Sequence, residues 1–250
     1  MIDYNPFSLE GKTILVTGAS SGIGRTAAIE CSKLGAKIIA TARNEQRLNE
    51  TIENLKGEGH QAIICDLTNE ASLDNMISEL PEIQGLINNA GVSILLPVKF
   101  VNSENLKSVF DVNTFAPIIL LQKLLKKKKI RKGASIVFTS SISGLGTSAV
   151  GSSMYAASKG AICSFIRCAA LELAPQNIRV NAVCPAMVNT DLLDILPTSD
   201  SEKNEELNNY PLGRLGNPSD VAHAMIYLLS DASSWVTGDN LVIDGGLTLK

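Results

Sequence analysis

The fold of this chain is decided by the stretch Thr13-Ile-Leu-Val-Thr-Gly-Ala-Ser-Ser-Gly-Ile-Gly24. Its first five residues are aliphatic or β-branched, which is typical of a buried strand. Glycines follow at positions 18, 22 and 24, and they permit a tight turn and a close approach of the backbone to a ligand. A helix that opens here, at Arg25, offers free N–H groups to a phosphate. The stretch therefore predicts either a dinucleotide-binding turn or a plain strand-to-helix turn.

Outward from this stretch, short β-branched runs alternate with helical segments along nearly the whole chain, as in a parallel sheet covered on both faces. Strands are expected at residues 13–17, 37–41, 62–65, 85–88, 135–139, 179–183 and 240–243. Helices are expected at residues 24–34, 45–55, 71–80, 103–129, 155–173 and 218–229. No repeat or proline-rich hinge divides the sequence. We therefore expect one α/β domain over residues 1–250, with a doubly wound (Rossmann) sheet of seven parallel strands.

One segment departs from this regularity. Residues 189–209 carry a polar, acidic run (TSDSEKNEELNN) after a short apolar patch (LLDIL). Long irregular insertions in compact α/β domains often cover a ligand, and inert surface excursions also occur. The two interpretations of 189–209 are therefore a lid and an inert loop.

Composition excludes several classes of protein. The net charge of −3 gives no electrostatic case for binding nucleic acid. No apolar run approaches the ~20 residues that cross a bilayer, and the N terminus lacks the pattern of a signal peptide. The basic run Lys126-Lys-Lys-Lys129, followed by Arg131 and Lys132, is interpreted as the solvated end of a helix. We expect a cytoplasmic protein that binds neither membranes nor nucleic acid.

Cysteine and histidine give no sign of a metal site. The five cysteines are scattered without a Cys-x-x-Cys pair, which favours reduced, buried thiols over disulfides. The two histidines, His60 and His223, are far apart in sequence and form no metal-ligand pattern. No metal is expected.

A second motif lies in Ser153-Met-Tyr-Ala-Ala-Ser-Lys-Gly-Ala161. On a helix, Tyr155 and Lys159 share one face, about one turn apart, so the phenol and the ammonium can interact. Alone, the pair could equally be a half-exposed helix face with an extended lysine. Its meaning depends on the other motifs.

Together the motifs resemble the short-chain dehydrogenase/reductase family in its single-domain form. The resemblance is carried by the G-x-x-x-G-x-G spacing of the glycine loop, the Tyr-x-x-x-Lys pair and Asn88-Asn-Ala-Gly91 at the end of a strand. Other features follow in family order along essentially the full chain. They are Leu9-Glu-Gly-Lys12, Asp66-Leu67, Asn113, Ser140-Ser141, Pro185 with Thr190, and Asp244-Gly-Gly246.

The resemblance implies a reaction and a set of catalytic residues. Tyr155 is the acid when a ketone is reduced and the base when an alcohol is oxidised. A free phenol titrates near ~10, so Lys159 and the charge of the oxidised nicotinamide are expected to lower the pKa of Tyr155. Lys159 also bonds the nicotinamide ribose.

The other two catalytic assignments have alternatives. Ser141 is expected to hold the substrate oxygen, although Ser140 and Ser143 lie in the same turn and Ser141 is one residue farther from Tyr155 than the family pattern. A one-residue insertion within residues 145–152 accounts for that difference. Asn113 is expected to anchor a water that connects Lys159 to solvent, or simply to kink its helix.

The cofactor follows from the end of the second strand, Ile38-Ile-Ala-Thr-Ala-Arg43. An acidic residue there would bond the ribose 2′-hydroxyl of NAD, whereas a basic residue accommodates a 2′-phosphate. The segment has no acid, so Arg43 predicts NADP(H). NAD(H) is not excluded, because Ser21 stands where many NADP-dependent relatives carry a second basic residue.

The remaining cofactor contacts come from the same resemblance, with Asp66 bonding the adenine amino group. The expected cofactor-binding residues are Gly18, Ser20, Ser21, Gly22, Ile23, Gly24, Arg43, Asp66, Leu67, Asn89, Ala90, Gly91, Tyr155, Lys159, Pro185, Val188 and Thr190. One departure is Ala186, which follows Pro185 where the family usually has glycine. A methyl group there narrows the nicotinamide side of the site but removes no catalytic group.

The substrate is less determined. Apolar residues in loop or lid positions favour a ketone or secondary alcohol on a hydrophobic body. They are Leu95, Leu96, Met154, Met187, Leu192, Leu193, Ile195 and Leu196. The segment Tyr210-Pro-Leu-Gly-Arg-Leu-Gly216 resembles 3-oxoacyl-carrier-protein reductases, and the basic run could meet an acidic acyl carrier protein. However, Ala174-Pro-Gln-Asn177 lacks the basic residues associated with carrier docking.

Two further possibilities concern the class of protein. A nucleotide-sensing regulator that keeps the fold without chemistry would be expected to lose Tyr155 or Lys159, and both are present. A homotetramer assembled through the helices at 103–129 and 155–173 is expected for this family. Such an assembly is compatible with catalysis.

Overall fold

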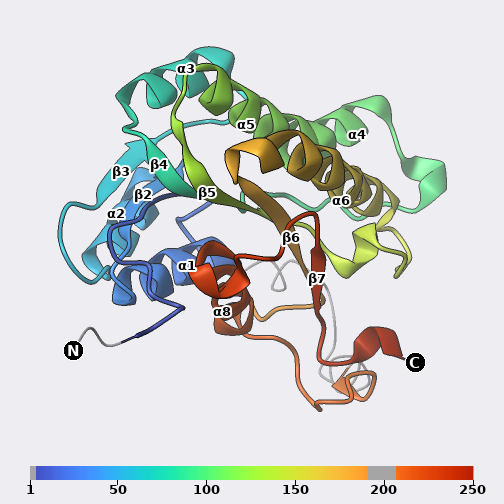
Figure 1. The fold of residues 1–250 in the computed structure, drawn as a ribbon. Coiled ribbons are helices and arrows are strands. Elements are labelled where there is room, and N and C mark those ends of the chain that lie inside the picture. The colour runs from blue at the N-terminus through green and yellow to red at the C-terminus, as the bar shows by residue number, and fades with distance from the viewer. Residues whose placement is uncertain (1–3, 191–206, 250) are drawn as a thin grey trace.

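The computed structural model describes residues 4–190 and 207–249, and its centre is a sheet of seven strands (Figure 1). The strand order is β3-β2-β1-β4-β5-β6-β7, and every neighbouring pair is parallel. This confirms the doubly wound α/β fold. The strands are β1 Thr13–Thr17, β2 Lys37–Ala42, β3 Gln61–Ile64, β4 Ile83–Asn88, β5 Ile130–Thr139, β6 Arg179–Pro185 and β7 Asn240–Ile243.

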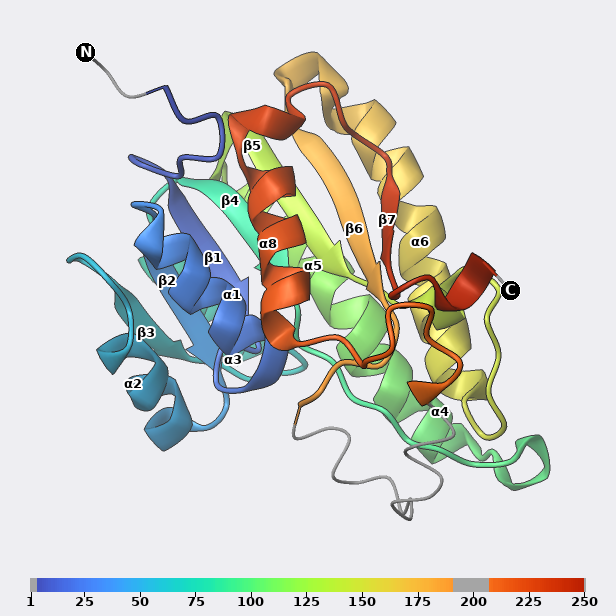
Figure 2. The same ribbon diagram turned by 90° about the horizontal axis from the view of Figure 1, so that it is seen from below.

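Helices cover both faces of this sheet (Figure 2). On one face α1, α2 and α8 pack around buried residues such as Leu48 and Met225. On the other, α3, α5 and α6 bury residues such as Met76 and Leu124. The bounds are α1 Gly22–Lys33, α2 Glu45–Glu53, α3 Glu70–Glu79, α4 Ser103–Phe110, α5 Ala116–Lys126, α6 Ser153–Leu173 and α8 Pro218–Leu229. Because both faces are covered, the strands bury apolar side chains on both sides.

The helix expected over 103–129 is not one regular helix, and that prediction was wrong in two respects. A π-helical segment, Asp111–Phe115, separates α4 from α5. The helix also ends at Lys126, because Lys128 has a φ of 56° and a left-handed residue cannot continue a right-handed helix. The basic run therefore lies across the end of α5, a turn and the start of β5.

The helical span Ser103–Lys126 has the length and apolar composition of a membrane-crossing helix. Its apolar side chains nevertheless serve the interior of this fold. Leu120 and Leu124 are fully buried in the cluster beneath α3, α5 and α6. This span therefore contributes to the core that packs against the sheet.

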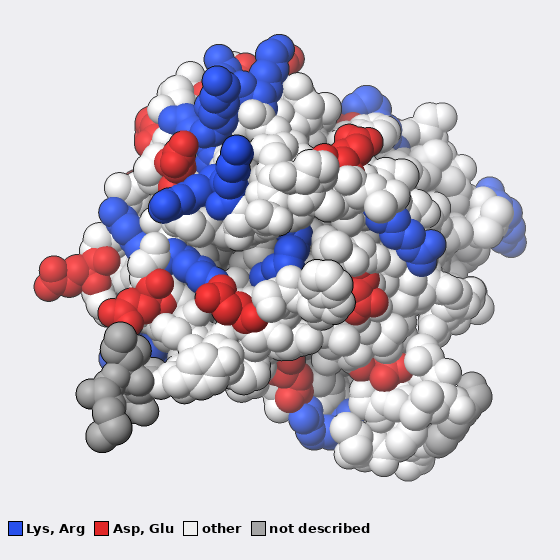
Figure 3. Space-filling model, in the orientation of Figure 1, with Lys and Arg blue, Asp and Glu red and all other residues white. Residues whose placement is uncertain are grey.

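The carboxyl ends of the parallel strands lie at one edge of the sheet, and the functional motifs meet there. Chain order reverses between β1 and β4, which is where ligands bind in open α/β sheets. The glycine loop follows β1, the Asn-Asn-Ala-Gly motif follows β4, and Ser140 and Ser141 follow β5. The basic run begins β5, so it lies at the opposite edge, where lysine and arginine gather on the surface (Figure 3).

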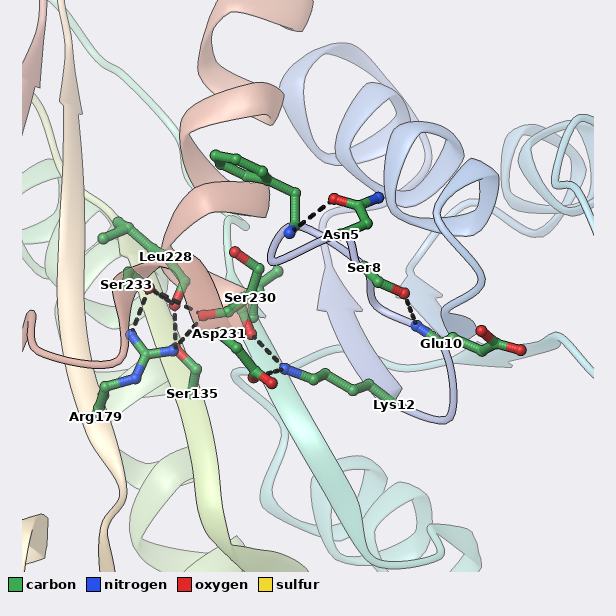
Figure 4. Close-up of polar contacts among 12 residues, drawn as sticks. Asn5, Ser8, Glu10, Lys12, Ser135, Arg179, Leu228, Ser230, Asp231 and Ser233 are labelled. Carbon is green, nitrogen blue, oxygen red and sulfur yellow. Dashed lines mark hydrogen bonds and ion pairs between the residues drawn. The ribbon is translucent and has the colours of Figure 1, made fainter. Parts of the chain in front are cut away.

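Toward that opposite edge, three side chains close the C-terminal end of α8 (Figure 4). Lys12 directly precedes β1, Ser135 lies within β5, and Arg179 begins β6. The last carbonyls of a helix have no partner within it, so other groups must satisfy them. The donors are Ser135 Oγ to Leu228 O at 2.6 Å, Lys12 Nζ to Leu229 O at 3.2 Å and Arg179 Nη2 to Ser230 O at 3.1 Å. Two of the three donors are cations, which also suits the negative end of the helix dipole.

Replacing Arg179 with Met should therefore destabilise the fold. The half-buried guanidinium also donates to Ser233 Oγ at 2.8 Å, so its loss removes charge-assisted hydrogen bonds to both Ser230 O and Ser233 Oγ. We expect a loss of about 2 kcal/mol in the free energy of unfolding, measured by urea denaturation. Arg131→Met, at an exposed arginine, is the control. Equal stability of the two variants would contradict this account of the α8 terminus.

Candidate active site

The glycine loop after β1 is packed too closely for side chains. Gly18 and Gly22 have φ values of +65° and +51°, which glycine adopts readily. A Cβ on Gly24 would lie 2.3 Å from the Gly18 carbonyl oxygen and 2.5 Å from Asn89 Nδ2. A Cβ on Gly18 would lie 2.9 Å from Ala90 Cα. The loop after β1 is therefore pressed against the loop after β4, and only glycine allows that contact.

Thr17, the last residue of β1, fastens these two loops together. Its hydroxyl accepts hydrogen bonds from the backbone N–H groups of Asn89 at 2.9 Å and Ala90 at 3.2 Å. Thr139, at the end of β5, donates to Asn89 Oδ1 at 3.2 Å. Sequence reasoning placed Thr17 at the end of the first strand but gave it no role. Its position as the residue just before Gly18 was the available signal.

The structure brings the proposed catalytic side chains of β5 and α6 together. The Ser141 hydroxyl lies close enough to the Tyr155 phenol to oppose the rise that burial causes in the tyrosine pKa, and Lys159 Nζ lies 5.7 Å from the centre of the Tyr155 ring. Ser140 points elsewhere: its hydroxyl donates to the Lys159 carbonyl at 3.0 Å and lies 3.1 Å from Cys163 Sγ. Ser143 reaches Ser141 through its backbone N–H. Of the three serines in this turn, Ser141 is therefore the one that contacts the tyrosine.

Asn113 lies in the π-helical segment, and its side chain is fully engaged by protein groups. Asn113 Oδ1 accepts from Val92 N at 2.8 Å, and Nδ2 donates to Val92 O at 2.9 Å and Ser158 Oγ at 3.0 Å. Ser158 Oγ in turn donates to the Tyr155 carbonyl at 2.7 Å. The amide thus ties the loop after β4 to α6. The role of Asn113 in anchoring a water stays a prediction.

Burial governs the titration of the tyrosine and the lysine. It lowers the pKa of Lys159 from 10.5 to about 8, although Nζ donates to the Thr139 carbonyl at 2.7 Å. Burial also raises the pKa of Tyr155, and the Ser141 hydroxyl opposes that shift. Among the protein's own groups the balance is therefore opposite to the expected lowering. A lowered tyrosine pKa in the loaded enzyme stays a prediction, since it also involves the nicotinamide charge.

The phosphate side of the site has the chemistry of an anion cradle. The first turn of α1 contains no acidic residue, and its N-cap, Ser21, makes no side-chain capping bond. A pyrophosphate would therefore meet unopposed positive charge at this terminus. Thr190, after β6, lies against the same loop, because a Cβ on Gly22 would be 3.2 Å from Thr190 Cγ2. The residues present fit a dinucleotide.

The residues expected to bind the adenosine lie around the ends of β2 and β3. Arg43 is exposed, and its charge helps to lower the pKa of Asp66. The stronger cause is Thr68, whose hydroxyl and N–H donate to Asp66 Oδ1 at 2.7 and 3.0 Å. On the side expected to bind the nicotinamide, Val188 and Gly216 form an isolated parallel β-bridge. Residues 191–206, most of the expected lid, lie outside the described residues.

A doubly wound sheet with a glycine-lined helix terminus and a Ser-Tyr-Lys cluster at one edge defines a nicotinamide-dependent oxidoreductase. Comparison with known proteins gives the family. Residues 18–248 match the family model described as enoyl-(acyl carrier protein) reductase. The chain belongs to the short-chain dehydrogenase/reductase family, as the motifs indicated.

Similar members of the family carry different names. The chain is 33% identical to a 3-oxoacyl-[acyl-carrier-protein] reductase of Rickettsia felis, over 96% of this chain and 98% of that protein. It is 33% identical to a cyclopentanol dehydrogenase of Comamonas testosteroni, over 95% and 97%. A solved structure from Beutenbergia cavernae, assigned as an NAD(P)-dependent gluconate 5-dehydrogenase with NADP at low occupancy, has a TM-score of 0.89 and 31% identity, covering 98% of this chain and 100% of that one.

The buried lysine should leave a signature in the pH dependence of stability. Since Lys159 titrates at about 8 in the folded chain and near 10.5 unfolded, the unfolded chain binds more protons between these values. The contribution of Lys159 to the free energy of unfolding therefore rises with pH across that window, by up to about 1.4 kcal/mol per pH unit. Lys159→Met removes this contribution, so its unfolding free energy should rise less steeply between pH 8 and 10. Parallel curves for the two proteins, measured by urea denaturation, would refute the assignment.

Proposed function

We propose that this protein is an NADP(H)-dependent oxidoreductase that interconverts a ketone and a secondary alcohol. The observation that carries the proposal is the contact of Ser141 with Tyr155, one helical turn from Lys159, at the sheet edge that also holds the glycine loop. No other assignment uses all three side chains. The weaker alternative, a non-catalytic dinucleotide sensor, leaves this buried cluster without a purpose.

In this mechanism the protein positions the carbonyl and supplies the proton. When bound, the nicotinamide supplies or accepts the hydride. Ser141 hydrogen-bonds the carbonyl oxygen, and the Tyr155 hydroxyl protonates that oxygen during reduction. Lys159 would favour the tyrosinate by its charge and would bond the nicotinamide ribose. Asn113 holds the loop after β4 against α6, so that the tyrosine and the lysine keep their relative positions.

The cofactor preference rests on Arg43. The end of β2 carries no acidic residue to bond a ribose 2′-hydroxyl, and the arginine is exposed beside Asp66. A guanidinium suits a 2′-phosphate in charge and geometry. NADP in the Beutenbergia structure is consistent with this preference. Use of NAD(H) as a poorer cofactor remains compatible with Ser21 in the glycine loop.

The substrate we favour is a ketone on a hydrophobic body. Leu96 N donates to Gly151 O at 2.9 Å, which joins the loop after β4 to the loop before α6. The neighbouring Leu95 is 46% exposed, so these joined loops present apolar surface just before the start of α6. Met154, at 2% exposure, is buried instead. Leu192, Leu193, Ile195 and Leu196 lie outside the described residues.

The alternative substrate, a 3-oxoacyl thioester on an acyl carrier protein, is supported by the Rickettsia relative. Its docking cannot use the basic run at Lys126, which lies at the far edge of the sheet from Tyr155. The ten residues of β5 separate the two regions, a span of about 30 Å. A carrier would have to approach the edge where the catalytic residues lie.

Assembly and location complete the proposal. Phe115 and Ile119 are exposed by 52% and 43% on the span from α4 to α5, and Leu171 on α6 is exposed by 79%. Exposed large apolar residues on these helices support a homotetramer formed through them. A cytoplasmic location is part of the same proposal.

Replacing Tyr155 with Phe should nearly abolish turnover while cofactor binding is retained. The substitution removes only the hydroxyl that donates the proton, and we expect kcat to fall by about 10³-fold or more. NADPH oxidation is measured with a 3-oxoacyl thioester, a cyclic ketone, a keto-steroid and a keto-sugar acid. NADPH binding, followed by nicotinamide fluorescence, is the control for folding. Retained turnover in Tyr155→Phe would contradict this mechanism.

Substitutions of Ser141 and Ser140 should distinguish a role in catalysis from a role in packing. Ser141→Ala removes a group beside the reacting oxygen, so we expect kcat to fall by about 10²-fold with little change in the melting temperature. Ser140→Ala removes the hydrogen bond to the Lys159 carbonyl, and we expect a loss of about 1 kcal/mol in stability with a smaller effect on kcat. The reverse pattern, in the same steady-state and melting assays, would assign the substrate contact to Ser140.

A further inference from the structure

Arg25 lies between the glycine loop and α2, although it has no place among the expected cofactor contacts. Its guanidinium donates to Ser20 O at 2.7 Å and to Arg47 O at 3.0 Å. Nε donates to Thr51 Oγ1 at 3.1 Å, and Nη2 forms an ion pair with Glu50 at 3.1 Å. One side chain from the first turn of α1 thus bonds both a loop carbonyl and the backbone of α2.

Thr51 makes a second connection between the same two elements. Its side chain is fully buried, and its hydroxyl lies 2.9 Å from Ala19 O. Two consecutive carbonyls of the glycine loop, those of Ala19 and Ser20, are therefore held on the side facing α2. In a planar trans peptide the C=O of one residue points opposite to the N–H of the next. Holding these carbonyls directs the N–H groups of Ser20 and Ser21 away from α2.

The contact with the Arg47 carbonyl concerns the second expected phosphate site, which is the start of α2 where the 2′-phosphate would bind. Arg47 lies in the first turn of α2, where its N–H donates to the N-cap Asn44. Arg43 directly precedes that cap. Fixing the backbone of this turn therefore fixes the origin of the Arg43 side chain relative to the glycine loop. A side chain as flexible as arginine binds more tightly when its origin is fixed.

We propose that Arg25, acting with Thr51, is a positioning residue that couples the pyrophosphate-binding loop to the 2′-phosphate-binding start of α2. The coupling to the 2′-phosphate rests on the proposed preference for NADP(H). Arg25 itself touches neither phosphate in this arrangement. Its loss affects NADPH at two places and NADH at one, because only NADPH carries the 2′-phosphate.

The test compares the dissociation constants of NADPH, NADH and adenosine 2′,5′-bisphosphate for the wild type and for Arg25→Met, which keeps an apolar stem. We expect the NADPH constant to rise about tenfold or more, and the NADH constant about threefold. The bisphosphate should follow NADPH. Thr51→Val should act in the same direction with a smaller effect. Binding is followed by nicotinamide fluorescence and, for the bisphosphate, by calorimetry.

Two variants serve as matched controls. Lys33→Met removes a cation from the same helix, where it pairs with Glu30 at 2.7 Å, and should leave all three constants unchanged. Glu50→Gln removes the ion pair but keeps the backbone contacts, so it should also have little effect. Melting temperatures measured without ligand show whether each variant is folded.

The outcomes separate this inference from the proposed function. If Arg25→Met changes the NADPH and NADH dissociation constants by the same factor, or changes neither of them, the proposed coupling is wrong. Arg43→Ala tests the cofactor preference independently, because it should bring the NADPH and NADH constants together. A wild-type protein that binds both cofactors equally overturns that preference and the 2′-phosphate half of the coupling. The NADH constant of Arg25→Met then still decides the role of Arg25 in the glycine loop.

Discussion

The site depends on the close approach of Gly24 to the Gly18 carbonyl and to the amide of Asn89. Because no Cβ intervenes, the start of α1 lies directly over the ends of β1 and β4. Thr17 holds this arrangement by accepting two N–H groups of the next loop. The position of the helix terminus, and hence of its dipole, follows from this packing. The Ser-Tyr-Lys cluster is placed relative to the terminus through Thr139, whose hydroxyl bonds Asn89 and whose carbonyl accepts from Lys159.

A buried lysine beside a buried tyrosine has an energetic cost that its surroundings do not fully offset. The pKa of Lys159 falls to about 8, which means that the protein disfavours its charge. The same burial raises the pKa of Tyr155. Strongly perturbed groups of this kind are typical of sites that move protons, because structural positions rarely retain them. The Ser141 hydroxyl opposes this rise in the pKa of Tyr155.

The sequence alone was sufficient to predict the features that depend on local spacing. The glycine positions, the Tyr155–Lys159 pair and the seven strands are each encoded within a few residues, and the structure contains all of them. The choice of Ser141 over Ser140 was open in the sequence, because two adjacent serines differ only in the direction that β5 gives them. The roles of Thr17 and Arg25 depend on elements distant in sequence, so spacing could not reveal them. The direction of the Tyr155 pKa shift depends on burial, which a motif does not specify.

The sequence offered only a kink at Asn113 as an alternative and did not predict a π-helical segment, because residues 111–115 continue the helical pattern on both sides. An α-helix turns by about 100° per residue, and a π turn holds one residue more than an α turn. The segment therefore absorbs one extra residue while α4 and α5 keep their buried faces. If the same residues formed a regular α-helix, everything beyond them would be rotated by roughly that angle, Leu120 and Leu124 would leave the core, and Asn113 would lose Val92. The irregular turn thus keeps the buried faces of α4 and α5 aligned, and the extra residue is accommodated only while this turn stays π-helical.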